Sequence, residues 1–257
     1  MSRYPAIIFT SLFLAWLPVA SSHAAQDMGA NQDAIIDAIA NPTRPDSDRE
    51  QDVDRKPLEV LTFTGVKPGD RVADFIPGGG YVTRLFSKIV GPMGHVYAVV
   101  PDELFKMRAG ADAAVKAIAA DPTYGNVTVL REPVNEFSAP EKLDLVWTSM
   151  NYHDLHDKFL GPADLAILNK SIFDALKPGG VYLVLDHAAE AGSGLRDTET
   201  LHRIDPAVVK KEVTAAGFVL EAQSDELKNP DDDYTLKVFD PEIRGRTDKF
   251  IFKFRKP

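Results

Sequence analysis

The stretch 72–83, VADFIPGGGYVT, constrains the fold of this chain more than any other part of the sequence. It starts as a short apolar strand, passes through Gly78, Gly79 and Gly80, and continues as a helix with an apolar face. A strand, a glycine turn and a helix form the first unit of a doubly wound sheet, in which the ligand lies beyond the carboxyl end of the strand. Glycine suits this turn because backbone without a Cβ approaches a ligand closely and adopts positive φ.

Asp74 is the only charged residue within the apolar end of this strand. A carboxylate at that position accepts a hydrogen bond from a ligand, or it pins the turn by binding backbone N–H groups. Both interpretations remain open at the level of the sequence.

Strand and helix patterns alternate along the rest of the chain. The sequence predicts strands at 95–100, 127–130, 143–148 and 181–186, a turn at 177–180, and helices at 33–40, 102–120 and 164–176. This alternation predicts crossover units and a mainly parallel sheet. The last part of the chain departs from it, with a helix at 206–216 and strands at 218–222 and 249–254.

The amino terminus has the pattern of a signal peptide. Arg3 precedes an apolar stretch at 6–19, and the small residues before Ala25 suit cleavage after Ala24. We expect residues 1–24 to be removed on export to the periplasm, with an uncleaved anchor as the alternative. The apolar stretch is too short to span a bilayer comfortably, so we expect no stable membrane span in the mature chain.

Composition excludes several classes of function. Of the 257 residues, 44% are hydrophobic, which supports a substantial core. The chain has 29 basic and 38 acidic residues, and this acidic balance argues against nucleic-acid binding, which depends on phosphate contacts. It has no cysteine, which excludes disulfides, thiolate nucleophiles and thiolate metal ligands.

The segment 44–55 carries acidic and basic residues mixed together. Such a run is usually a solvated face. The alternative is a lid over the mouth of the site at the glycine turn.

Four motifs in order define a resemblance to a known family: VADFIPGGGY at 72–81, LDLV at 143–146, LKPGG at 176–180 and AAGF at 215–218. Over roughly 55–257 they resemble the successive motifs of class I S-adenosylmethionine-dependent methyltransferases, and in particular an exported bacterial subgroup of predicted methyltransferases. The resemblance implies an α/β, Rossmann-like, seven-stranded and mainly parallel sheet with strand seven antiparallel. It also implies S-adenosylmethionine as cofactor and methyl transfer to an unknown small acceptor.

Together, the signal-peptide pattern and the resemblance divide the chain into a signal peptide (1–24), an N-terminal helical lid or extension (25–57) and a methyltransferase-like domain (58–257). It implies a set of cofactor-binding residues: Asp74, Ile76, Pro77, Gly78, Gly79, Gly80, Tyr81, Asp102, Glu132, Asn135 and Asn151. Two positions depart from the family pattern. Ile76 stands at the first glycine position, and Val100 stands where the family has a ribose-binding acid, for which Asp102 is the nearest substitute. These departures motivate the alternative of a non-catalytic binding or scaffold protein of the cell envelope.

The polar cluster after the fourth predicted strand supplies the candidate catalytic residues. Methyl transfer needs an aligned nucleophile and a base, and His153 is placed to be that base with Asp154 orienting it. Tyr81 and Tyr152 are candidates to face a sulfonium by cation–π attraction. The alternative is that His153 satisfies a backbone carbonyl and that both tyrosines pack in the core.

Two further groups suggest ligands. The first could surround a divalent metal, although we expect no metal there: His153, Asp154, His156, Asp157 and His187. The second favours an anionic small acceptor, or forms only surface ion pairs: Arg196, His202, Arg203, Arg244 and Arg246.

Overall fold

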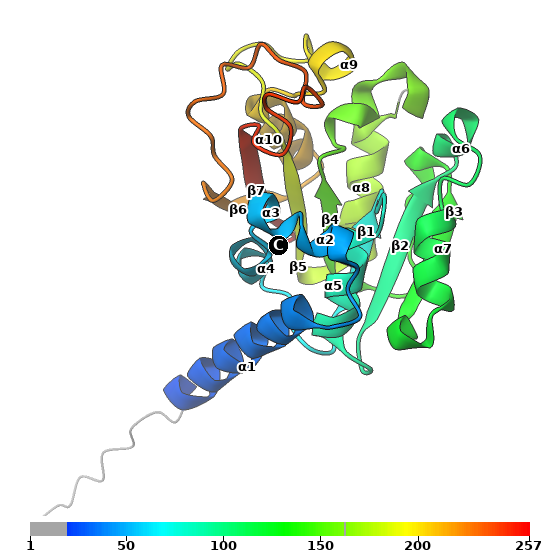
Figure 1. The fold of residues 1–257 in the computed structure, drawn as a ribbon, viewed down its shortest axis with the longest axis vertical. Coiled ribbons are helices and arrows are strands. Elements are labelled where there is room, and N and C mark those ends of the chain that lie inside the picture. The colour runs from blue at the N-terminus through cyan, green and yellow to red at the C-terminus, as the bar shows by residue number, and fades with distance from the viewer. Residues whose placement is uncertain (1–19, 162) are drawn as a thin grey trace, which may run out of the picture.

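The computed structural model describes residues 20–161 and 163–257, so the predicted signal peptide, 1–24, lies almost entirely outside the described residues. The fold is built on one seven-stranded sheet with the order β3-β2-β1-β4-β5-β7-β6 (Figure 1). The strands are β1 (Arg71–Phe75), β2 (His95–Pro101), β3 (Val127–Glu132), β4 (Leu143–Ser149), β5 (Leu176–His187), β6 (Val219–Ser224) and β7 (Lys249–Arg255). Strand β7 runs antiparallel to both of its neighbours, and the other pairs are parallel. The predicted seven-stranded doubly wound sheet is confirmed.

Helices cover both faces of the sheet. The α-helices are α1 (Ala20–Ala40), α2 (Asp46–Arg49), α3 (Asp52–Arg55), α4 (Pro57–Thr64), α5 (Tyr81–Val90), α6 (Leu104–Met107), α7 (Ala113–Ala120), α8 (Leu165–Ala175), α9 (Thr198–Leu201) and α10 (Pro206–Ala215). Four short 3-10 helices are η1 (Pro122–Tyr124), η2 (Val134–Glu136), η3 (His153–His156) and η4 (Lys158–Leu160). Within the described residues, none of these helices combines the length and the apolarity that a membrane crossing requires.

The alternation of side chains along each strand divides the core into two layers. In β1, Val72 packs with α1, α4, α5 and α7, whereas Ala73 and Phe75 point to the opposite face and pack with α8 and α10. The strands are apolar on both sides because helices cover both sides, as in other parallel sheets.

Local signals set the ends of the helices. Helix α5 follows Gly80, which has φ of 79°, and α8 begins at Asp164, whose carboxylate accepts hydrogen bonds from the backbone N–H groups of Ala166 and Ile167. Helix α10 begins at Asp205 in the same way, with Pro206 as its first residue.

Three predicted elements differ from the structure. The helix predicted at 102–120 is broken into α6 and α7 around Gly110, whose φ is 74°. The turn predicted at 177–180 lies inside β5, because Leu176 still pairs with Leu143 and a register shift absorbs the extra residues. The helix predicted at 33–40 is the end of the longer α1.

The carboxyl ends of the parallel strands face the longest stretch of the described residues that has no helix or strand. The segment 225–248, which joins β6 to β7, and the short helix α9 lie together at that end of the molecule (Figure 1). Helices α2 and α3 lie in front of the sheet near the same end (Figure 1). Of these parts, the segment 225–248 and α3 contribute residues to the cavity described below.

Candidate functional site

The glycine turn after β1 carries an unusual residue. Ile76 has φ of 58°, although it is β-branched, and Gly78 and Gly80 also have positive φ. The turn is held by two contacts of Ile76: its N–H donates to the Val99 carbonyl over 2.9 Å, and its carbonyl accepts from Asn151 Nδ2 over 3.1 Å. A left-handed conformation costs a non-glycine residue roughly 1–2 kcal/mol. The two hydrogen bonds of Ile76 hold the turn in this conformation although the residue is not glycine.

The three glycines have different surroundings. A Cβ added to Gly78 or Gly79 would meet no atom within 4 Å, whereas a Cβ on Gly80 would overlap the side chain of Ile118 in α7. Gly80 is therefore required for packing, and Gly78 and Gly79 leave open space in which a ligand can approach the backbone.

Asp74 ties β1 to α5. Its Oδ2 accepts a hydrogen bond from Thr83 Oγ1 over 2.6 Å, and its side chain is buried. Burial raises the pKa of Asp74 to about 6, while Thr83 and the charge of Arg55 act in the opposite direction. The carboxylate of Asp74 thus binds the helix that follows the glycine turn. This contact favours a structural role for Asp74 over a direct contact with a ligand.

The segment 44–55 lies against the amino-terminal end of α5. Arg44 forms a two-pronged ion pair with Asp52, with N–O distances of 2.6 and 2.9 Å. The Tyr81 hydroxyl donates to Asp52 over 2.6 Å, and Arg84 of α5 pairs with Asp48 over 2.9 Å. Because Arg44 and Asp48 are buried, these contacts fix α2 and α3 over the glycine turn.

A cavity of about 680 Å³ lies between α3, α4, α5, the ends of β4 and β5, the start of β7 and the segment 225–248. Its volume falls within the range of about 300–1,000 Å³ that is usual for small-molecule sites. Most of its wall is apolar, with Val60, Leu61, Val82, Leu85, Trp147, Met150, Leu185, Leu227, Val238 and Phe239. The polar and charged side chains of the wall are Gln51, Asp54, Arg55, Tyr81, Ser149, His187, Arg244 and Lys249.

His187 lines this cavity at the end of β5. Its Nδ1 lies 2.7 Å from Thr247 Oγ1, and its Nε2 has no hydrogen-bond partner among the described residues. Burial lowers the pKa of His187 well below its usual value, and the neighbouring charges of His153 and Lys249 lower it further. The side chain is therefore a neutral imidazole with a nitrogen available to accept a proton.

Lys249 lies opposite His187 in the β5–β7 pair and is 4% exposed. Its Nζ donates to two backbone carbonyls, those of Gly245 over 3.0 Å and Thr247 over 2.9 Å. Burial lowers the pKa of Lys249 to about 8. The sequence offered one signal for these two residues: each stands at the ligand end of a predicted strand.

His153 has a different environment, on the opposite face of the sheet. Its Nδ1 lies 2.9 Å from Asp186 Oδ1, and its Nε2 lies 3.1 Å from Asp154 Oδ1. Burial opposes the charged ring, but Asp186 and Asp154 outweigh it and raise the pKa of His153 to about 10. Both ring nitrogens of His153 have carboxylate partners and its pKa is raised, so neither nitrogen is free to act as the predicted base in this arrangement.

The other predicted cofactor residues divide into two groups. Asp74, the turn from Ile76 to Tyr81, and Asn151 lie together at the end of β1, and of these only Tyr81 lines the cavity. Pro77 contributes its carbonyl to the turn, accepting from the Gly80 N–H over 2.9 Å.

The second group lies at the ends of β2 and β3, away from the cavity. Asp102 pairs with Arg131, the Glu132 carboxylate accepts from the Ser138 N–H and hydroxyl, and Asn135 Oδ1 accepts from the Asp164 N–H. The side chain of Val100 is buried in the core beside α5.

The predicted ligand groups are also partly dispersed. His153 and Asp154, joined by His202, place possible metal-ligand atoms within 4.8 Å of one another, but His156 pairs with Glu212 instead. Tyr152 is buried, and its hydroxyl donates to Glu212.

The predicted anion-binding arginines separate in the same way. Arg196 pairs with Glu190 and Asp197, and Arg203 pairs with Asp232 inside the protein. Arg246 donates to a backbone carbonyl, and Arg244 alone among the predicted arginines lines the cavity.

The chain is similar to known methyltransferases. No family model matches it. It is 32% identical over 148 residues to the ubiquinone/menaquinone biosynthesis C-methyltransferase UbiE of Vibrio cholerae, a region that covers 56% of this chain and 52% of that protein. It is 33% identical over 130 residues to UbiE of Ectopseudomonas mendocina, covering 49% and 45%. The chain thus spans about half the length of these relatives.

Solved structures show the same fold. A SAM-dependent methyltransferase from Aquifex aeolicus superposes with a TM-score of 0.54 at 18% identity, covering 77% of this chain and 88% of that chain. The glycopeptide N-methyltransferase MtfA superposes with a TM-score of 0.54 at 18% identity, covering 80% and 90%. The predicted resemblance to class I S-adenosylmethionine-dependent methyltransferases is confirmed in sequence and in fold.

Proposed function

We propose that this chain is an S-adenosylmethionine-dependent methyltransferase that acts on a small acceptor. The observation that carries the proposal is the cavity of about 680 Å³ at the carboxyl ends of β4 and β5, beside the glycine turn. Doubly wound proteins bind their ligands at this edge of the sheet. The similarity to methyltransferases in sequence and fold supports the same assignment.

The glycine turn fits the cofactor. The open space over Gly78 and Gly79 lets the backbone meet a nucleoside closely, and Tyr81 joins the turn to the cavity. When bound, S-adenosylmethionine supplies an electrophilic methyl group on its sulfonium. Solved structures of MtfA contain S-adenosylmethionine or S-adenosylhomocysteine, which supports this choice of ligand.

The residues of the chain supply orientation and proton removal. Trp147, Leu185 and Phe239 form an apolar part of the cavity wall that can contact the body of an acceptor. His187 is neutral and accepts the proton of the acceptor at Nε2, while Thr247 holds its Nδ1. His187 thus takes the role that the sequence analysis gave to His153.

Calorimetric titration of the full chain with S-adenosylmethionine and S-adenosylhomocysteine tests the proposal. We expect both to bind and to raise the melting temperature by about 5–10 °C at a hundred times Kd, since such saturation adds about 2.7 kcal/mol. The variant Gly79→Ala fills the open space and is expected to weaken binding with little loss of stability. Gly80→Ala is expected to lower stability instead, since its Cβ collides with Ile118.

Turnover is tested with S-adenosylmethionine labelled in its methyl group and a small-molecule extract of the host. Transfer of label into a small molecule, together with formation of S-adenosylhomocysteine, supports the proposal. Absence of binding to both adenosyl compounds would favour the alternative of a non-catalytic binding or scaffold protein.

We also propose that the protein is exported to the periplasm. The support is Arg3, the apolar stretch 6–19 and the small residues up to Ala24. Amino-terminal sequencing of the protein from fractionated host cells tests this proposal. We expect a mature chain that begins at Ala25 in the periplasmic fraction, and an intact Met1 in the cytosol would contradict it.

A further inference from the structure

The charged side chains that line the cavity are unbalanced. Three are cations, Arg55, Arg244 and Lys249, and one is a carboxylate, Asp54. In the part of the chain that the structure describes, none of the three cations lies within 4.0 Å of a carboxylate oxygen. Of the three, only Lys249 is buried, and because buried charges in proteins are normally paired, a negatively charged ligand group in the cavity would neutralise it.

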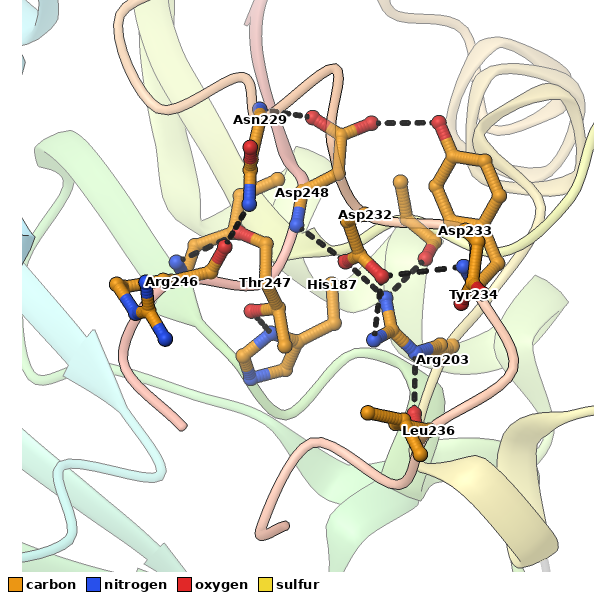
Figure 2. Close-up of polar contacts among 12 residues, drawn as sticks. His187, Arg203, Asn229, Asp232, Asp233, Tyr234, Leu236, Arg246, Thr247 and Asp248 are labelled. Carbon is orange, nitrogen blue, oxygen red and sulfur yellow. Dashed lines mark hydrogen bonds and ion pairs between the residues drawn. The ribbon is translucent and has the colours of Figure 1, made fainter. Parts of the chain in front are cut away.

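Lys249 is the most buried of these cations. Two of its three N–H groups are used by the carbonyls of Gly245 and Thr247, and the third is left for the cavity. Its neighbour Asp248 forms no ion pair with it and binds other residues: Asp248 Oδ1 accepts from the Asn229 N–H over 2.8 Å, and Oδ2 accepts from the Tyr234 hydroxyl over 3.0 Å (Figure 2).

A buried polar network holds this arrangement in place. Arg203, which is fully buried, forms a two-pronged ion pair with Asp232, and Asp232 also accepts from the Asp248 N–H over 2.6 Å (Figure 2). The same network supports Thr247, which contacts His187 (Figure 2). The network therefore anchors the backbone at the start of β7, and Lys249 Nζ is bound to the carbonyls of Gly245 and Thr247.

The cations stand at different distances from the glycine turn. Arg55 lies 4.5 Å above the ring of Tyr81, at the turn itself. Lys249 starts β7, which is three strands away from β1 in the sheet, or roughly 14 Å at the usual strand spacing. A cofactor that lies on the glycine turn therefore has Arg55 as its nearest cation, and Lys249 is left for the acceptor.

We infer that the acceptor is an apolar molecule with one anionic group, and that Lys249 binds this group while Trp147, Leu185 and Phe239 contact the apolar body. This inference rests on the proposed function and adds the chemical class of the acceptor. It places the anionic group beside His187, since Lys249 and His187 are cross-strand neighbours on one face of the sheet.

Two fluorescent probes with similar aromatic bodies test the inference on the full chain. The probe 8-anilinonaphthalene-1-sulfonate is an anion, and N-phenyl-1-naphthylamine is neutral. We expect the variant Lys249→Met to bind the anionic probe about tenfold or more weakly, because a charged hydrogen bond is lost, and to bind the neutral probe unchanged. Arg246→Met is the matched control, because Arg246 is exposed and does not line the cavity, and it is expected to change neither affinity.

A second variant keeps the inference testable if Lys249→Met fails to fold. Arg244 is exposed at the cavity, so Arg244→Met is expected to fold normally and to weaken only the anionic probe, by about threefold to tenfold. Near-ultraviolet circular dichroism of each variant confirms that the core is intact. Equal loss of both probes, or loss of neither in both cavity variants, would overturn the inference.

Titration of the same variants with S-adenosylhomocysteine separates the acceptor from the cofactor. We expect Lys249→Met to bind S-adenosylhomocysteine like the unmodified chain. If its affinity falls as much as that of the anionic probe, Lys249 binds the carboxylate of the cofactor and the inference is wrong. If the unmodified chain binds no adenosyl compound, the proposed function fails, and the probe comparison still reports on the charge of the cavity.

Discussion

Two histidines near the ends of adjacent strands have opposite properties. His153 and His187 have ring centroids 6.1 Å apart, yet the pKa of His153 is raised to about 10 and that of His187 is lowered well below its usual value. The difference follows from their neighbours. His153 lies between the carboxylates of Asp186 and Asp154, whereas His187 contacts the hydroxyl of Thr247 and lies near Lys249.

The geometry of β5 explains how such close groups are kept apart. Asp186 and His187 are consecutive in the strand, so their side chains point to opposite faces of the sheet. The face that carries Asp186 is filled with apolar residues and the Asp186–His153 ion pair. The face that carries His187 opens into the cavity. The comparison teaches that a polar group near a strand end is available for chemistry only when no other residue already satisfies it.

The largest expected effect on stability comes from breaking the ion pair between Asp186 and His153. Asp186→Asn leaves the His153 imidazolium buried with one partner fewer, and we expect the free energy of unfolding to fall by about 3–5 kcal/mol, measured by urea denaturation. Asp154→Asn is the control. Its side chain is 22% exposed, so the loss is expected to be smaller. Equal losses at both positions would show that the two carboxylates hold the ring equally.

Substitution of His187, which faces the cavity, is expected to lower the rate of methyl transfer and not the stability of the fold. With an acceptor in hand, His187→Gln is expected to lower kcat about 100-fold or more, because a positioned base is lost, and to leave the affinity for S-adenosylmethionine unchanged. His153→Gln is expected to lower the free energy of unfolding. A variant His187→Gln with normal kcat would remove the base from the proposed mechanism.

Nuclear magnetic resonance titration of the histidine rings compares the two groups directly. The pKa of His153 is raised in the folded state, so the stability that it contributes is fully present below about pH 6.5 and is lost as pH rises through about 10. His187 has a lowered pKa, so its effect is opposite: stability falls as pH drops below about 6.5, because the unfolded chain takes up the proton at a higher pH than the folded chain does. Two rings that titrate together near pH 6.5 would contradict the assignment.

The smallest effect concerns the turn that borders the cavity. Ile76 has positive φ, which glycine adopts without cost and alanine does not. We expect Ile76→Gly to be more stable than Ile76→Ala by about 1 kcal/mol in thermal unfolding, the reverse of the order found in a regular strand or helix. The comparison of the two variants removes the effect of losing the Ile76 side chain. An Ile76→Ala variant of equal or greater stability would show that the turn relaxes to negative φ.

Much of the site framework could be predicted from the sequence. The strand and the helix on either side of the glycine turn were predicted from local patterns, and the antiparallel β7 was implied by the resemblance to methyltransferases; the structure reproduces both. The partners of the polar residues could not be predicted. Asp74 binds Thr83, and Asp102 binds Arg131. The chain has many other threonines and arginines, and nothing in the sequence singles out these two as the partners.

The sequence by itself determined that this chain forms a doubly wound sheet with a glycine turn after β1, because apolar periodicity and glycine positions act over a few residues. Only the tertiary structure decided which histidine has a free nitrogen. Asp186 lies 33 residues from His153 in the chain, and Thr247 lies 60 residues from His187, so their contacts arise only when strands and loops from distant parts of the sequence come together.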